Sequence, residues 1–163
     1  MDELVIFGVR TPVADPKATL ADLRTYAQSK GGWAQMLDPE AVLGPDHLRS
    51  AFEHARRAFD QGRNTTDSIE MEFLLYASGE RQISKAIEVA GAKARRPAVL
   101  VMFGGGITED VLARYSWKRD DGLIEPTAER LRAAGFSKVE IESAGRNASD
   151  LILERVARVD LIK

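Results

Sequence analysis

The chain has 163 residues, of which 44% are hydrophobic and 29% are charged, and its formal net charge is −2. This composition is typical of a globular domain with a sizeable core, and the charge argues against a non-specific nucleic-acid coat protein. The absence of cysteine excludes disulfides, thiolate nucleophiles and cysteine-based zinc sites. No apolar run approaches the roughly 18 residues of a membrane span, so we expect a cytoplasmic protein without membrane contact.

The first half of the chain predicts two short strands and several helices. Residues 4–9 and 33–37 are apolar runs that indicate strands, and residues 18–29 have helical spacing. Pro45 opens a strongly amphipathic helix that ends at Gly62.

Residues 67–91 predict two further helices, separated by Ser78 and Gly79. Asp67 and Glu70 have the spacing of a capping box at the start of this segment. Gly91 stands where a left-handed residue would end the second helix.

The second half continues with a dense apolar run over 97–103, which predicts a buried strand. A helix is predicted from Thr108 to Trp117, and Pro126 opens another that ends before Gly135. Residues 138–142 alternate between charged and apolar side chains, which is typical of an edge strand. The last helix is predicted to begin at Asn147.

These elements follow one another without a repeat or a linker. They predict one compact mixed α/β domain over 1–163, in which helices flank a small mixed or antiparallel sheet.

The sequence contains little that indicates a catalytic site. His47 and His54 lie seven residues apart on one predicted helix, therefore about 10 Å apart, which is too far for helical zinc chelation. We expect both to be structural. The loop Gly104–Gly106 could cradle a phosphate, but the motifs of nucleotide-binding loops are absent. We predict a protein that is not an enzyme and carries no metal or cofactor, with a small nucleotide-binding enzyme as the weaker alternative.

One segment of the chain resembles a known family far more specifically than the rest does. Residues 74–83, Leu-Leu-Tyr-Ala-Ser-Gly-Glu-Arg-Gln-Ile, closely resemble the signature of the kinase-regulating small subunit of the KEOPS (EKC) complex, the TPRKB family, whose archaeal members are of about this size. The resemblance extends back through residues 54–59 and Asn64 and forward to residues 153–157. It covers nothing identifiable over 98–145.

The resemblance implies a non-catalytic subunit that binds the KEOPS kinase/ATPase and, through it, the other subunits. It also implies recruitment of tRNA through its 3′ CCA end, in support of threonylcarbamoyladenosine (t6A) modification. A purely protein-binding activator of the kinase, without RNA contact, remains the alternative.

The RNA-binding candidates surround the signature, where cations could hold phosphates and apolar side chains could support unstacked bases. Interleaved acidic residues also allow an ordinary solvated face, and Tyr76 and Ile83 could simply be core. The candidates are Arg56, Arg57, Tyr76, Ser78, Gly79, Arg81, Ile83 and Lys85.

The last predicted helix is apolar on more than one face, which indicates either a core helix or a helix that also docks a partner. The resemblance favours docking of the kinase, with Leu151, Leu153, Val156 and Leu161 as candidates. A second basic group, Lys93, Arg95 and Arg96, follows Gly91 and could complement the dipole of the helix before it.

Overall fold

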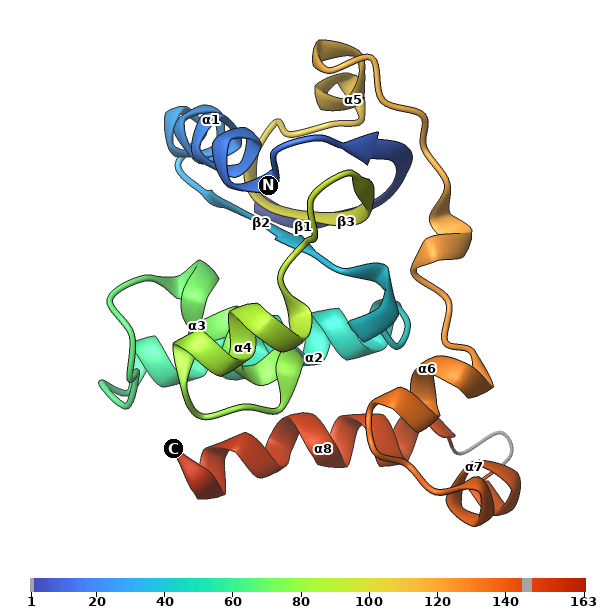
Figure 1. The fold of residues 1–163 in the computed structure, drawn as a ribbon. Helices are drawn as coiled ribbons and strands as arrows, with labels where there is room; N and C mark the ends of the chain where they lie inside the picture. Colours follow the sequence, from blue (N-terminus) through green and yellow to red (C-terminus); the bar gives the residue numbers. More distant parts are fainter. Residues whose placement is uncertain (1, 145–147) are drawn as a thin grey trace. The chain divides into compact units, whose positions relative to one another are not determined.

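The computed structural model describes residues 2–144 and 148–163 and divides into two compact units (Figure 1). The first unit comprises the chain up to Pro39 together with Gly91–Ile124, and the second comprises Glu40–Ala90 and Glu125–Lys163. The predicted mixed α/β class and the small antiparallel sheet are confirmed. The predicted start of the last helix at Asn147 lies outside the described residues.

The first unit is built on a three-stranded sheet. Its strands are β1 (Asp2–Val13), β2 (Trp33–Leu37) and β3 (Arg96–Gly105), in the order β1-β3-β2 with both pairs antiparallel. The densest apolar run of the sequence forms β3, and residues 98–102 are completely buried, as a central strand covered on both faces requires.

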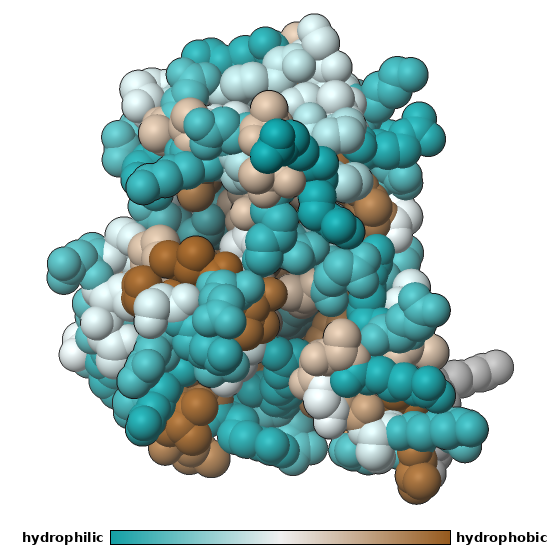
Figure 2. Space-filling view, in the orientation of Figure 1, coloured by the Kyte–Doolittle hydropathy of each residue, from teal (hydrophilic) through white to brown (hydrophobic). Residues whose placement is uncertain are grey.

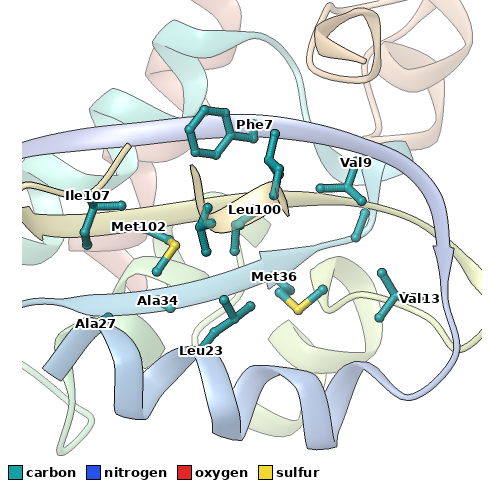
Figure 3. Close-up of a cluster of buried hydrophobic side chains, with 13 residues drawn as sticks. Phe7, Val9, Val13, Leu23, Ala27, Ala34, Met36, Leu100, Met102 and Ile107 are labelled. Atoms are coloured by element: carbon teal, nitrogen blue, oxygen red, sulfur yellow. The ribbon is translucent and has the colours of Figure 1, made fainter. Parts of the chain in front are cut away.

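Helix α1 (Pro16–Ser29) covers this sheet. The Asp15 side chain caps it by accepting the Ala18 N–H at 3.1 Å. Leu23 and Ala27 of α1 then join Met36 and Leu100 in the buried cluster of Figure 3. The unit ends with the short helix α5 (Asp110–Arg114) and the 3₁₀ turn η2 (Asp121–Leu123).

The second unit is helical and follows the 3₁₀ turn η1 (Pro39–Ala41). Its helices are α2 (Pro45–Asp60), α3 (Ile69–Ser78), α4 (Ile83–Ala90), α6 (Ala128–Ala133), α7 (Lys138–Ala144) and α8 (Ala148–Ile162). Residues 72–78 of α3 are all buried, because α3 packs against α2, α4 and α8. A helix that is enclosed on every side is the core of its unit.

The edge strand predicted over 138–142 is wrong, because these residues form α7. Ser137 and Glu140 make a capping box that the sequence interpretation missed. The Ser137 hydroxyl accepts the Glu140 N–H and the Glu140 carboxylate accepts the Ser137 N–H, both at 3.0 Å.

The helix predicted over 108–117 is also shorter, since α5 ends at Arg114 and Ser116 has a positive φ of 55°. The capping box predicted at Asp67 and Glu70 does not form, since Ser68 is the N-cap of α3 and no side chain caps it.

Gly91 is not the predicted left-handed residue but bridges Leu37 of β2. Within the described ranges, no helix is both long and apolar enough to cross a membrane.

Candidate functional site

The signature segment 74–83 spans the end of α3, a tight turn and the start of α4. Gly79 ends α3 in the left-handed conformation (φ 75°, ψ 13°), and its N–H donates to the Leu75 carbonyl at 3.0 Å. A Cβ atom at Gly79 would lie 2.9 Å from Nε of Arg155. Glycine therefore serves both the backbone conformation and the close approach of Arg155.

Two side chains from other helices cap the last carbonyls of α3. His47 of α2 donates from Nε2 to the Ala77 carbonyl at 2.8 Å, and its Nδ1 accepts the Leu43 N–H at 3.0 Å. Arg155 of α8 donates from Nη2 to the Ser78 carbonyl at 2.6 Å, where its positive charge faces the negative end of the helix dipole.

Burial lowers the pKa of His47 to about 4, so the ring is neutral at pH 7 and both ring nitrogens are used. His47 thus has the structural role predicted for it.

A buried carboxylate lies at the other end of α3. Glu72 is completely buried, and its oxygens accept the N–H groups of Thr65 at 2.9 Å and Thr66 at 3.0 Å. The Lys163 ammonium donates to it at 2.9 Å. Burial alone would raise the pKa of Glu72, but these hydrogen bonds outweigh it and hold the pKa below its usual value.

Asp160 of α8 makes the second long-range anchor. Its carboxylate accepts hydrogen bonds from the Tyr76 hydroxyl, from His54 Nδ1 at 2.8 Å and from Arg63 Nη2 at 3.2 Å. Burial would raise the pKa of Asp160, but the hydrogen bonds from Tyr76 and His54 lower it. The end of α8 is therefore fixed to both α2 and α3.

These contacts join the separate stretches that carry the resemblance. His54 meets Tyr76 at a ring-centroid distance of 5.3 Å, and Arg155 lies against Gly79. Asn64 donates to the Thr66 carbonyl at 2.9 Å. This bond shapes the loop whose Thr65 and Thr66 N–H groups donate to Glu72. Many residues of the signature therefore have a structural role, because they attach α8 to the rest of the unit.

Helix α8 has a core side and an outer side. Val156 is 1% exposed and packs in the core, which leaves it out of any docking surface of this structure. Leu151 and Leu153 are half-buried, whereas Leu161 is 84% exposed and Ile162 is 44% exposed. Figure 2 shows hydrophobic surface over the α3–α4 segment and at the C-terminal end of α8.

The predicted RNA-binding residues divide into exposed and buried ones. Tyr76 and Ser78 are buried, which favours the core alternative for Tyr76. Ile83 is half-buried, and all four predicted cations are exposed. The turn brings Ser78, Gly79, Arg81 and Ile83 together, while Arg56 and Arg57 lie on the solvent side of α2.

The exposed cations differ in their partners. Arg56 pairs with Glu53 at 2.6 Å, and Lys85 lies 3.7 Å from Glu88. Among the described side chains, no carboxylate lies within ion-pair distance of Arg57 or Arg81. Of the four predicted cations, these two arginines therefore carry the charge that is most available to a phosphate.

The triple glycine does not form an open phosphate cradle. Gly104 and Gly105 are part of β3, and the Gly105 N–H donates to the Lys30 carbonyl at 3.2 Å. A Cβ atom at Gly104 would lie 2.9 Å from Ile107 Cδ1, so Ile107 fills this space. Within residues 2–144 and 148–163, no group of three His, Asp or Glu side chains could hold a metal ion.

The segment thus combines helix-fixing polar contacts with exposed apolar residues and exposed cations, features that suit a binding surface. The sequence model of the family described as kinase binding protein CGI-121 matches residues 14–140. The chain therefore belongs to the CGI-121 family of kinase-binding, KEOPS-associated proteins, in agreement with the resemblance of the signature. A comparison with curated protein sequences finds no match.

Several important residues were missed by sequence reasoning. Glu72, Arg155, Asp160 and Lys163 anchor α8, and Ile87 adds 47%-exposed apolar surface on α4. A charged residue inside an apolar helical segment, as Glu72 is, was the available signal, because such a group needs a buried partner.

The structure makes a first prediction about the signature turn. Gly79→Ala should lower the free energy of unfolding by about 2–3 kcal/mol, because a positive φ costs about 1–2 kcal/mol and the hydrogen bond from Arg155 to Ser78 is disturbed. Gly62 is a matched control with a φ of 66° and open space around it. Gly62→Ala should lower the free energy of unfolding, measured with urea, only by the cost of placing alanine at a positive φ. Equal costs would show that the Arg155 contact contributes nothing.

Proposed function

We propose that the protein is a non-catalytic, cytoplasmic regulatory subunit that binds the KEOPS kinase/ATPase through the outer side of α8. It also recruits tRNA through the 3′ CCA end and so supports t6A modification by the complex. The observation that carries this proposal is the apolar pair Leu161 and Ile162, which is exposed at the end of an anchored helix.

The anchors make this pair suited to docking. Asp160 and Lys163 flank it and are tied to α2 and α3, so the last turn of α8 is already ordered. A preordered surface loses less conformational entropy when it binds. Burial of Leu161 and Ile162 by a partner would also remove apolar area from water at about 25 cal/mol per Å². The half-buried Leu151 and Leu153 can extend the contact along α8.

The RNA part of the proposal rests on the signature turn. Gly79 ends α3 in a left-handed conformation, and Arg155 holds the adjacent Ser78 carbonyl, so the turn is fixed in place. Arg81 supplies an exposed charge for a phosphate, and Ile83 supplies apolar surface for an unstacked base. Salt-dependent binding of intact tRNA, compared with tRNA that lacks CCA, tests this assignment.

A purely protein-binding activator of the kinase is the second candidate. The burial of Tyr76 and the pairing of Arg56 with Glu53 favour it, because both reduce the surface offered to RNA. If the protein is only an activator of the kinase, intact tRNA should bind no better than tRNA without CCA. Neither RNA should then bind with an affinity that depends on salt.

The unpaired arginines supply a second prediction. Arg57→Gln/Arg81→Gln should weaken tRNA binding about tenfold or more at 100 mM salt and reduce the slope of log K against log salt by about 1.5, for two lost phosphate contacts. The control Arg56→Gln/Lys85→Gln should have a smaller effect, because these cations have carboxylate neighbours. Fluorescence anisotropy with labelled tRNA measures both. An unchanged slope in the first variant would contradict the phosphate contacts.

A further inference from the structure

One end of the sheet in the first unit gathers four exposed cations, Arg10, Arg95, Arg96 and Lys118. The Arg10 N–H donates to the Lys118 carbonyl at 2.9 Å, and the Arg95 N–H donates to the Val13 carbonyl at 2.6 Å. Arg96 is the register partner of Val13 on β3. Four positions from three parts of the sequence therefore meet where β1 ends and β3 begins. We call these four residues the cationic end.

The cationic end is not neutralised, unlike the cations beside it. Lys93 donates to the Gly91 carbonyl at 2.6 Å and lies 3.8 Å from Asp38. Arg119 pairs with Glu109 at 2.7 Å and with Asp121 at 2.8 Å. None of the four members has such a partner among the carboxylates of the described side chains. In a protein of net charge −2, this is a local concentration of free positive charge.

The position of Arg95 and Arg96 differs from the one that the sequence suggested. Gly91 leaves α4 to bridge Leu37 of β2. Lys93 stays beside the end of the helix, where it donates to the Gly91 carbonyl, whereas Arg95 precedes β3 and Arg96 begins it. Arg95 has a φ of 60°, a conformation that a non-glycine residue rarely adopts. The Arg95 N–H donates to the Val13 carbonyl in this conformation, so the backbone fixes the place of Arg95 beside the end of β1.

The surroundings of the cationic end indicate the chemistry of its partner. The exposed large hydrophobic residues of the described chain are Ile87, Val139, Leu161 and Ile162, and all four belong to the second unit. Stable protein interfaces have an apolar centre and a depletion of charge there. A surface of unpaired cations without large exposed hydrophobic side chains instead fits a polyanion that is held through its phosphates.

We propose that the cationic end binds the sugar–phosphate backbone of RNA with residues other than those of the signature turn. This inference rests on the proposed function, since the RNA is taken to be tRNA. Phosphate contacts carry no sequence information, so the cationic end binds the body of tRNA whether or not the 3′ CCA end is present. The signature turn then supplies selectivity for the 3′ end, and the cationic end supplies general affinity.

The test compares two RNAs and two variants of the full-length chain. The variant Arg95→Gln/Arg96→Gln should bind both intact tRNA and tRNA without CCA about tenfold more weakly at 100 mM salt, with a slope reduced by about 1.5 to 2. The control variant Lys30→Gln/Arg132→Gln changes the charge equally at two exposed residues. Lys30 borders the opposite end of β3, where its carbonyl accepts the Gly105 N–H, and Arg132 belongs to α6, so this variant should bind as the wild type does. Arg10→Gln/Lys118→Gln, which alters neither Arg95 nor its backbone, should repeat the loss.

The outcomes separate this inference from the proposed function. If the Arg95 and Arg10 variants bind tRNA normally while Arg57→Gln/Arg81→Gln binds it weakly, the inference is overturned and the proposed function stands. If wild-type protein binds neither RNA, the RNA part of the proposed function fails, and the inference fails with it. Loss of kinase binding with unchanged RNA binding would instead make the cationic end a contact for an acidic protein surface, which also overturns the inference.

Discussion

Glu72→Gln should lower the free energy of unfolding by about 3 kcal/mol, one of the largest effects of any single substitution in this protein. The buried Lys163 ammonium would lose its counter-charge, and breaking one half of a buried ion pair costs about 3–5 kcal/mol. The glutamine side chain has only one acceptor oxygen. Its NH₂ group, which is a donor, would therefore face other donors, either the Lys163 ammonium or the N–H groups of Thr65 and Thr66. Urea unfolding measures the loss.

A double-mutant cycle isolates the ion pair from the other contacts. Lys163→Met leaves the Glu72 carboxylate with its threonine donors only, and the double variant Glu72→Gln/Lys163→Met removes both charges. The double variant should be more stable than the sum of the single losses predicts, by about 1–3 kcal/mol. The control Glu154→Gln removes an exposed carboxylate that pairs with Arg158 on α8, and it should cost less than about 1 kcal/mol. A coupling of zero would contradict the buried pair.

The same anchors make stability depend on acid pH. The pKa values of Glu72 and Asp160 are both lowered in the folded protein by hydrogen bonds that outweigh burial. Their stabilisation is fully present above the usual carboxyl pKa values of about 4, and it is lost as the pH falls through the lowered values. Wild-type protein should therefore lose stability below pH 4 more steeply than Glu72→Gln does.

The strands were predictable because their signal is local. Residues 4–9, 33–37 and 97–103 are apolar runs with few alternatives, and each lies within an observed strand. Residues 138–142 failed because alternating Lys, Val, Glu, Ile and Glu fits an edge strand, while the capping box at Ser137 and Glu140 favours a helix. Two signals conflicted there, and the one that satisfies backbone N–H groups determined the structure.

The anchors of α8 were beyond prediction from one sequence. Glu72 and Lys163 are 91 positions apart, and His54 and Asp160 are 106 positions apart. Neither pairing has a local signature, because each depends on how helices pack. The turn at Ser78 and Gly79 was predictable because glycine in a left-handed C-terminal position has a local cause. The cap that Arg155 provides became visible only in the packed structure.

Leu161→Glu should reduce binding of the KEOPS kinase by at least a hundredfold while leaving the free protein almost unchanged. Leu161 is 84% exposed, so the charge remains solvated in the free protein, and stability should change by about 0.5 kcal/mol or less. In the proposed complex the carboxylate would be carried into an apolar interface without a counter-ion. That desolvation costs several kcal/mol, and each 1.4 kcal/mol is a tenfold loss of affinity.

Val139 provides the matched control for this substitution. It is 70% exposed, apolar and part of the same unit, but it lies on α7 and not on α8. Val139→Glu should therefore bind the kinase as the wild type does, in calorimetry with the purified kinase subunit. If Leu161→Glu binds normally and Val139→Glu does not, the kinase uses the α7 surface. If both bind normally, docking must use another surface, of which Ile87 on α4 offers the next exposed apolar residue. Ile87→Glu would then be the variant that loses the kinase, because an unpaired charge opposes burial there for the same reason.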